Sequence, residues 1–251
     1  MEPLVSVIIL NYNGLRFAEQ CVRSVLDSDY PNFEVILVDN GSVDGSHEIL
    51  CQSFGTVPKV RIVRNPRNLG FAEGNNVGYR NSKGDVVVFL NIDTKVERTW
   101  LKELVGAMSS NDSVGGAQSR LMSMRDTRVV DSVGPSIDWL GFVYLRYHRG
   151  GLADEVKDLF YAEGACMAFK RKFVEEVSLG KVPFDSDYFL YFEDSDLGWR
   201  IRLRGYRIIF VPSSTVYHYR AGCASTASQY IGAFSFAKNR LSTLVKNYSL
   251  G

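Results

Sequence analysis

Apolar and polar residues in the first 110 positions follow the alternation of strands and helices. Short runs rich in valine, isoleucine and leucine are typical of strands buried on both faces, and they occupy residues 5–10, 33–38, 59–63 and 85–90. Between them, helices are predicted at residues 15–26, 42–54, 70–81 and 96–108. This alternation predicts right-handed βαβ crossovers and a mostly parallel sheet. The fold class is therefore α/β, a Rossmann-like sheet with helices on both faces.

The second half of the chain has a less regular pattern. Strand-like segments are residues 114–122, 128–133, 161–169, 206–211 and 215–219, and helices are predicted at residues 171–177 and 193–203. Residues 137–147 are rich in aromatic side chains and predict a hairpin or a flap. We find neither a linker nor a repeat, so the sequence predicts a single domain over residues 1–251 with a mixed second half.

Polar side chains follow each of the four strands in the first half. They are found at residues 11–13 (Asn-Tyr-Asn), 39–40 (Asp-Asn), 65–68 and 91–93 (Asn-Ile-Asp). Ligands of such sheets bind beyond the carboxyl ends of the strands, so four polar ends together predict a crevice lined with hydrogen-bonding groups. Turn formation explains the Asn-Gly pairs at 13–14 and 40–41 equally well when each is taken alone.

Glycines recur every four residues in one predicted helix, at Gly70, Gly74 and Gly78, next to Asn75 and Asn76. This spacing places the glycines on one face of the helix, where the absence of side chains allows close packing. The segment is not the dinucleotide-binding G-x-G-x-x-G motif, and the sequence has no P-loop.

Composition limits the class of protein. The chain is 45% hydrophobic and 23% charged, as globular proteins are, and its net charge of +1 gives no electrostatic reason to expect a nucleic-acid partner. The four cysteines form no C-x-x-C pair, so we expect free thiols rather than zinc ligands or disulfides. No apolar stretch approaches the ~20 residues of a membrane span, and we expect a cytoplasmic protein without a signal peptide.

Two residues near the predicted crevice have side chains suited to a cation or a diphosphate. Asp93 follows a strand, where a carboxylate can hold a hard cation against a diphosphate; an ordinary turn or a helix N-cap also explains it. His218 follows an apolar strand, and Arg220 with the small residues after it leaves room for a phosphate. A packed or surface histidine is the alternative.

Three acids, Glu193, Asp194 and Asp196, lie within four residues at a predicted helix start. The helix dipole favours acids at this end, which is a purely structural explanation. Aromatic residues at 188–192 and at Trp199 flank the acids, and partial desolvation among them would suit a general base. The chemistry of the residues leaves both explanations open.

The C-terminal segment, residues 227–251, predicts an amphipathic helix. Its apolar residues on one side are Tyr230, Ile231, Phe234, Leu241, Leu244, Val245 and Tyr248. Its basic residues are Lys238, Arg240 and Lys246. Such a helix can lie on a membrane, which would make the protein peripheral at the inner face. Packing on its own domain is the simpler interpretation.

Six motifs occur in an order that resembles one enzyme family. In chain order they are VSVIILNYNG, EVILVDNGSVDGS, NPRNLGFAEGNN, VVVFLNIDT, YFLYFEDSDLGWRIRLRGYRI and VYHYRAG. They closely resemble family 2 glycosyltransferases, above all rhamnosyltransferase-like and polysaccharide-assembly members, over residues 5–248. The resemblance implies a GT-A fold, with a nucleotide-binding half (1–110) and an acceptor half (111–226). It also implies inverting transfer of a hexosyl or rhamnosyl group from a UDP- or dTDP-linked donor to a saccharide or lipid-linked saccharide.

The resemblance assigns the donor site residue by residue. The residues expected at the nucleotide sugar are Asn11, Tyr12, Asp39, Asn68, Gly70, Asn75 and Asn91. Asn91 stands where the family's metal motif has its first acid, and this amide lowers the expected metal affinity. Asp93 remains the expected ligand of Mg²⁺ or Mn²⁺, and His218 matches a histidine that contacts the metal or the diphosphate.

The resemblance also implies that the acidic cluster supplies the general base, and by position we predict Asp194. Glu193 and Asp196 would orient the acceptor or support the loop. A sugar nucleotidyltransferase is a second hypothesis, although residues 11–16 match its glycine-rich basic loop poorly. A binding module without catalysis is a third, and the intact acidic cluster argues against it.

Overall fold

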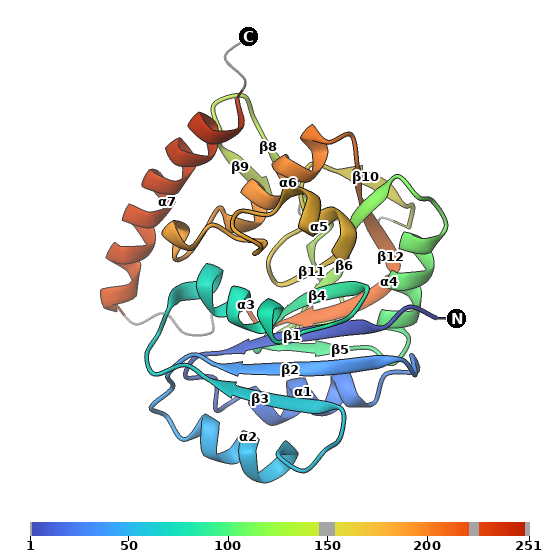
Figure 1. Ribbon diagram of the computed structural model, residues 1–251, viewed down its shortest axis with the longest axis vertical. Coiled ribbons are helices and arrows are strands. Elements are labelled where there is room, and N and C mark those ends of the chain that lie inside the picture. The colour runs from blue at the N-terminus through green and yellow to red at the C-terminus, as the bar shows by residue number, and fades with distance from the viewer. Residues whose placement is uncertain (1, 146–153, 221–225, 249–251) are drawn as a thin grey trace.

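The computed structural model describes residues 2–145, 154–220 and 226–248, and its first half contains the predicted strands and helices (Figure 1). The strands are β1 (Val5–Asn11), β2 (Phe33–Asp39), β3 (Val60–Arg64) and β4 (Val86–Asn91). The helices are α1 (Ala18–Leu26), α2 (Ser46–Phe54) and α3 (Gly70–Arg80). The four strands pair in parallel in the order β4-β1-β2-β3, which confirms the predicted parallel sheet.

The rest of the chain adds strands of three to twelve residues and four α-helices among the described residues. The strands are β5 (Thr94–Val96), β6 (Val114–Ser123), β7 (Val130–Ser132), β8 (Pro135–Ile137), β9 (Val143–Leu145), β10 (Lys157–Leu159), β11 (Cys166–Lys170) and β12 (Arg207–His218). The helices are α4 (Trp100–Ser109), α5 (Arg171–Val177), α6 (Glu193–Leu203) and α7 (Thr226–Asn247), with a 3₁₀ turn, η1 (Ser186–Tyr188).

A single mixed sheet joins the two halves of the chain. Its main path runs β10-β12-β6-β11-β4-β1-β2-β3, while β5 pairs with β12 and β7 pairs with β6. The halves meet where β11 pairs antiparallel with β4. The hairpin β8–β9 stands apart from this sheet and agrees with the predicted aromatic-rich hairpin; residues 146 and 147 of that prediction lie outside the described residues.

Several predicted boundaries were wrong. The segment predicted as a helix from residue 96 first forms β5 and becomes helical only at Trp100. β12 is one strand where two were predicted, because a register shift between Val211 and Thr215 accommodates the intervening Pro-Ser-Ser. β5 and β10 were missed because a three-residue strand is too short to show a period of two.

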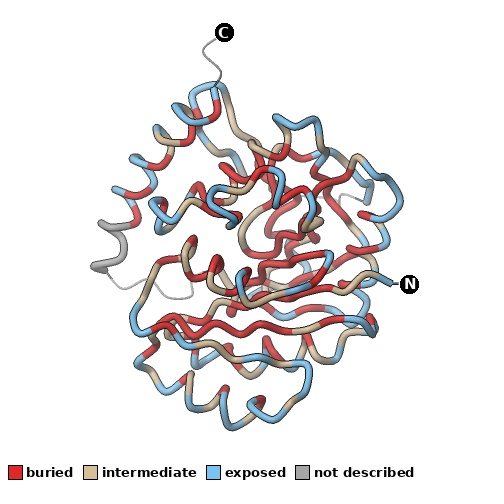
Figure 2. Tube along the Cα trace, in the orientation of Figure 1, coloured by how far each residue is buried: buried red, intermediate tan, exposed pale blue. Residues whose placement is uncertain are grey.

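Side chains from both faces of the sheet form two cores. Along β1, Val5, Val7 and Ile9 enter one core and Ile8 enters the other, as the alternation of side chains in a strand requires. Helices α1, α2 and α4 cover the first core, and α3, α5 and α6 cover the second. Figure 2 shows the resulting burial along the central strands. The predicted arrangement of helices on both faces is confirmed.

Helix α3 approaches the sheet through the predicted glycine face. A side chain at Gly78 would collide with Ile8 of β1, and one at Gly74 would lie 2.7 Å from Leu10. The first turn of α3, which begins at Gly70, therefore lies close to the carboxyl ends of β1 and β2.

We expect Gly78→Ala to lower the free energy of unfolding by roughly 1–3 kcal/mol, because the added methyl group overpacks the α3–β1 contact. Gly106→Ala is the matched control. Gly106 is also helical and has no heavy atom within 4 Å of an added methyl group, so it should stabilise by ~0.5–1 kcal/mol. Urea denaturation measures both, and equal effects would contradict the close contact.

Candidate functional site

A buried hydrogen-bond network joins the carboxyl ends of β1 and β2. The side-chain nitrogen of Asn11 donates to Asp39 Oδ1 (3.0 Å) and to the hydroxyls of Ser42 and Ser46. Asp39 Oδ2 accepts from the Ser42 backbone N–H (3.3 Å) and lies 3.5 Å from Nε of Arg64. Asn11 and Asp39 are both buried. The network fixes the loop after β2 against β1.

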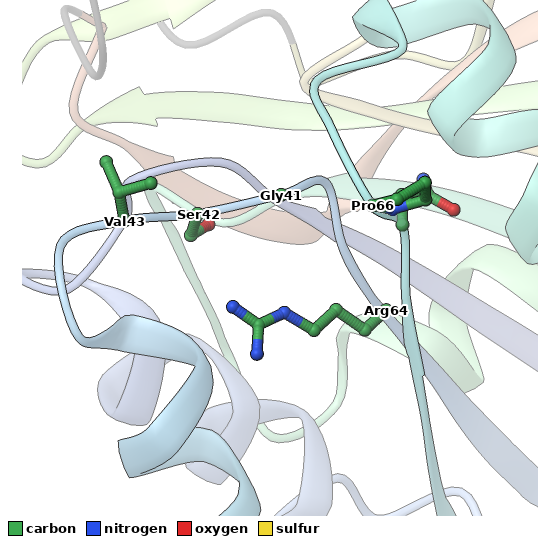
Figure 3. Close-up of a pocket in the computed structure, with 6 residues that line it drawn as sticks. Gly41, Ser42, Val43, Arg64 and Pro66 are labelled. Atoms are coloured by element: carbon green, nitrogen blue, oxygen red, sulfur yellow. The ribbon is translucent and has the colours of Figure 1, made fainter.

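A cavity of about 330 Å³ opens beside this network at the ends of β2 and β3. Its lining residues are Gly41, Ser42, Val43, Arg64, Asn65 and Pro66. Figure 3 shows the Arg64 side chain extending from β3 toward the 41–43 loop. The volume is within the range of small-molecule sites, ~300–1,000 Å³, and the polar lining comes from two of the predicted strand ends.

Asn40 connects the loops that follow β2 and β3. Its Nδ2 donates to Asn68 Oδ1 (2.9 Å) and to the Gly70 carbonyl (3.1 Å). Its Oδ1 accepts from Asn65 Nδ2 (3.0 Å). Asn68 Oδ1 also accepts from the N–H of Gly70 (2.8 Å), the first residue of α3. The predicted donor residues Asn68 and Gly70 thus shape the edge of the crevice.

Three other predicted donor residues lie at or near the same end of the sheet. Tyr12 directly follows β1 and is partly exposed. Asn75 is buried in α3, where its Nδ2 donates to the Phe71 carbonyl (3.0 Å). Asn91 ends β4 with a partly exposed side chain that makes no hydrogen bond to the described residues, so its amide is open to a ligand.

The pairing of β5 with β12 brings Asp93 and His218 together. Thr94 lies opposite His218 in this antiparallel pair, and the Tyr219 N–H donates to the Asp93 carbonyl (3.0 Å). His218 Nε2 is then 3.4 Å from Asp93 Oδ1. Two residues that are far apart in the sequence therefore share one site because of a strand that the sequence did not reveal.

Asp131 and Glu163 complete this cluster, and the sequence analysis missed both. Asp131 Oδ2 lies 3.3 Å from His218 Nδ1, and Asp131 Oδ1 accepts from Nε of Arg220 (2.5 Å). Arg220 Nη2 donates to Glu163 Oε1 (2.8 Å). The only available signal for Asp131 was a carboxylate inside a short apolar strand, and Glu163 had none.

Flanking carboxylates control the charge of His218. Burial lowers the pKa of His218, but its hydrogen bonds with Asp131 and Asp93 outweigh that effect and raise the pKa to about 9. In the protein without ligands the cluster therefore holds two cations, His218 and Arg220, among three carboxylates.

The donor atoms at Asp93 and His218 fit a divalent cation shared with a diphosphate. A carboxylate on one ring nitrogen is the usual support of a metal-bound histidine, and Asp131 on Nδ1 leaves Nε2 facing Asp93. Within the described residues, no three histidine, cysteine or acidic side chains are arranged to hold a metal. A cation here would complete its coordination with phosphate oxygens, as Mg²⁺ usually does.

Asp194, at the start of α6, is the partly exposed acid of the cluster. Its Oδ2 accepts from the Gly164 N–H (3.0 Å) and its Oδ1 from the Ser195 N–H (2.7 Å). Burial by the surrounding protein raises the pKa of Asp194 to about 7, although these two N–H groups oppose the rise. A carboxylate that titrates near neutral pH suits a general base.

The other two acids have different surroundings. Glu193 is buried, one of its oxygens has no partner among the described residues, and burial raises its pKa well above the ordinary value. Asp196 is fully buried and accepts from Nε of Arg200 (2.9 Å) and Nδ2 of Asn247 (2.9 Å). Of the two roles predicted for Asp196, these contacts favour support of the loop and of α7.

The loop that leads into α6 has a strained backbone. Phe189, Tyr191 and Phe192 have φ angles of 57°, 71° and 71°, a left-handed region that costs residues with side chains on the order of 1–3 kcal/mol each. Two helices hold this loop. The Phe71 N–H of α3 donates to the Phe189 carbonyl (2.5 Å). Nδ2 of Asn239, from α7, lies 2.7–2.9 Å from the carbonyl oxygens of Tyr188, Leu190 and Tyr191.

One turn connects the acidic cluster to the cluster around His218 and Arg220. Glu163 pairs with Arg220, and the N–H of the next residue, Gly164, donates to Asp194. Consecutive Cα atoms are ~3.8 Å apart, so the two clusters adjoin each other at this turn. The arrangement places Asp194, the candidate base, close to the cluster that contains the candidate metal ligands Asp93 and His218.

Comparisons with known proteins identify the family of the chain. Residues 6–178 match the family model described as Glycosyl transferase family 2. A putative teichuronic acid biosynthesis glycosyltransferase, TuaG from Bacillus subtilis, is 36% identical over 102 residues, which are 41% of this chain and 40% of that protein. Across the first curated relatives, the matched segments span between 15% and 45% of the relative's length.

Solved structures share the fold at low sequence identity. GalNAc-T7 with UDP, GalNAc and Mn²⁺ has a TM-score of 0.77 and 20% identity, and covers 96% of this chain and 47% of its own. The mannosyltransferase PcManGT from Pyrobaculum calidifontis, in complex with GDP-Man and Mn²⁺, has a TM-score of 0.69 and 22% identity, over 99% of this chain and 66% of its own. These matches confirm the predicted GT-A fold.

The contacts of Asp196 predict a structural phenotype. Asp196→Ala should lower the free energy of unfolding by ~3–5 kcal/mol, because it leaves the largely buried Arg200 charge uncompensated. Asp185→Ala is the control. Asp185 pairs with the part-exposed Lys246, and its loss should cost about 1 kcal/mol or less. Urea denaturation distinguishes the two variants. A loss of about 1 kcal/mol or less for Asp196→Ala would contradict the supporting role and favour the other predicted role, orientation of the acceptor.

Proposed function

The chain belongs to glycosyl transferase family 2, and from this premise we propose that it transfers a sugar from a nucleoside diphosphate donor to a saccharide hydroxyl. The observation that carries the proposal is the 163–164 turn, which joins Asp194 on one side to Arg220 on the other. A displacement at the anomeric carbon needs a base beside the acceptor hydroxyl and positive charge beside the leaving group. Family membership also favours sugar transfer over nucleotidyl transfer.

In the proposed reaction, Asp194 takes the proton of the acceptor hydroxyl as the hydroxyl oxygen bonds to the anomeric carbon. The bond between that carbon and the diphosphate oxygen breaks, and its electron pair leaves with the diphosphate. The positive charge of Arg220 faces the departing group. Because the reaction is one displacement without a protein nucleophile, the anomeric configuration inverts.

We propose Mg²⁺ or Mn²⁺ as the cofactor, with Asp93 and His218 as its protein ligands. When bound, such a cation neutralises charge on the departing diphosphate. The amide of Asn91 provides no negative charge where an acid would. Metal binding should therefore be weak without nucleotide and stronger with it.

We propose a UDP- or dTDP-linked hexose or rhamnose as the donor, with the nucleotide at the cavity beside Asp39. The acceptor is proposed to be a saccharide or lipid-linked saccharide of a growing polysaccharide. The similar protein TuaG is named as a putative glycosyltransferase of teichuronic acid biosynthesis, which supports this proposal. Buried polar atoms without partners among the described residues, Gln118 Nε2 and Glu163 Oε2, lie beside the 163–164 turn and would suit sugar hydroxyls.

Asp194→Asn should reduce sugar transfer by ~10²–10⁴-fold, because it removes the base and almost no volume. Calorimetry with UDP and Mn²⁺ should show nearly unchanged binding in the same variant. Activity is measured as UDP release from a panel of UDP-sugars with saccharide acceptors. Turnover at the wild-type rate would show that another group is the base.

The pKa of Asp194, about 7, sets the acid limb of the pH profile. The base must be deprotonated, so kcat/KM should rise with pH through about 7 and level off above it. The measurement is kcat/KM for one UDP-sugar in buffers across this range. A flat profile from about pH 5 to 8 would contradict a base with this pKa.

Asp39→Asn should weaken UDP or dTDP binding by about tenfold or more, because hydrogen bonds to a charged group contribute ~1.5–3 kcal/mol. Asp29→Asn is the control, since Asp29 follows α1, precedes β2 and pairs with the exposed Arg98. Thermal stabilisation by UDP, dTDP and GDP, with and without Mn²⁺, identifies the nucleotide. Equal binding by wild type and Asp39→Asn would remove Asp39 from the donor site.

A further inference from the structure

Helix α7 packs on the protein with its polar side. Among its described side chains, the buried polar ones recur every four residues, at Ser235, Asn239, Thr243 and Asn247. This spacing forms one stripe along a helix. Soluble helices usually bury their apolar stripe instead, so the orientation of α7 requires a cause on the surface that it covers.

The cause is a row of acceptors beneath the helix. Asn239 reaches the carbonyl groups of the strained 188–191 segment, and Asn247 donates to Asp196. The Thr243 hydroxyl lies 2.8 Å from the Tyr188 hydroxyl. These buried acceptors need donors, because an unmet buried polar group costs ~1–3 kcal/mol. The polar stripe of α7 provides them.

The side of α7 that faces away from the rest of the molecule is exposed (Figure 2), and the apolar stripe lies on that side. The exposed fractions are 70% for Phe234, 55% for Leu241, 82% for Val245 and 45% for Tyr248. We call these four residues the outer face of α7. On a helix they lie within one stripe, opposite Asn239 and Thr243.

The β8–β9 hairpin extends this apolar surface. The Tyr248 hydroxyl donates to the Trp139 carbonyl (2.6 Å), and Arg240 donates to the Leu140 carbonyl (2.8 Å). Trp139 itself is 76% exposed, and Phe142 lies under the Arg240 guanidinium. The helix and the hairpin tip therefore form one continuous surface with an exposed tryptophan at its edge.

The charged side chains of α7 itself have one sign. Residues 197–251 contain arginines and lysines but no aspartate or glutamate. Lys238 and Arg240 lie beside the outer face, while Lys246 is paired with Asp185 and Asp196. The hairpin contains one acid, Asp138, whose carboxylate accepts hydrogen bonds from the N–H groups of Leu140 and Phe142.

We propose that the outer face of α7 and the tip of the β8–β9 hairpin bind the surface of an anionic lipid bilayer. Apolar side chains next to lysine and arginine, with tryptophan and tyrosine at the edge, match the interface between acyl chains and anionic headgroups. Pairing of two copies through this face would bring Lys238 and Arg240 of both copies together without an acid on either helix.

The helix would lie on the bilayer and not cross it. None of the helices in the described part of the chain is long and apolar enough to span a membrane. The polar stripe also stays bonded to the 188–191 segment and to Asp196, so only the outer face is available to lipid.

The test is co-sedimentation of the full chain with vesicles of equimolar phosphatidylcholine and phosphatidylglycerol. We expect the wild type to bind, and to bind several-fold less to pure phosphatidylcholine or in high salt. The double variant Leu241→Glu/Val245→Glu should lose about tenfold or more in partitioning. Both positions are exposed, so the variant should keep the wild-type melting temperature.

Val156→Glu is the matched control. Val156 is 57% exposed and directly precedes β10, on the other side of the molecule from α7 in Figure 1. It should bind vesicles as the wild type does. Failure of the wild type to bind anionic vesicles, or equal binding by the double variant, would overturn the proposal. So would a dimer in analytical ultracentrifugation that the double variant abolishes, because the face would then belong to a second copy.

Lipid binding by the outer face of α7 does not depend on the proposed sugar transfer. Binding to vesicles needs neither donor nor acceptor, and UDP release from soluble saccharides needs no vesicle. A double variant that releases UDP normally but does not bind vesicles supports the lipid contact. A wild type that binds vesicles but releases no UDP would leave the lipid contact intact and overturn the proposed function alone.

Discussion

The strained segment before α6 is the constraint on which the acidic side of the site depends. Three of its residues, Phe189, Tyr191 and Phe192, are left-handed, and the chain enters α6 directly from them. Such a backbone persists only where its surroundings hold it. Two contacts hold this segment: the Phe71 N–H of α3 donates to the Phe189 carbonyl, and Asn239 of α7 donates to the Tyr188 carbonyl. Asp194 is the second residue of α6, so these contacts fix its position.

The same constraint decides which side of α7 is free. Carbonyl groups of the 188–191 segment and the buried Asp196 require donors, so α7 turns its asparagines and Thr243 inward. Because the opposite face of a helix points the other way, the stripe that contains Leu241 and Val245 then faces solvent. The local chemistry that supports the acidic cluster therefore also creates the apolar surface, and a lipid contact there would act on the helix that holds the loop.

The side of the site that contains Asp93 and His218 depends on strand pairing across the chain. Asp93 ends the parallel half, whereas His218 ends β12 in the second half, and the three residues of β5 place them side by side. Asp131 then orients the imidazole and pairs with Arg220. The turn of Glu163 and Gly164 joins this cluster to Asp194. The proposed base and the proposed leaving-group site, which come from distant segments, thus meet at the carboxyl end of one sheet.

The sequence by itself determined the parallel half, the polar strand ends, the glycine face of α3 and the acidic cluster, because each depends on local periodicity or on adjacent residues. It also predicted the family that the comparisons confirm. Only the tertiary structure decided that β5 joins Asp93 to His218, that Asp131 and Glu163 belong to the site, and that α7 faces outward with its apolar side. Short strands and single carboxylates have no period to detect. The orientation of an amphipathic helix depends on the surface that it covers, and that surface exists only after the chain has folded.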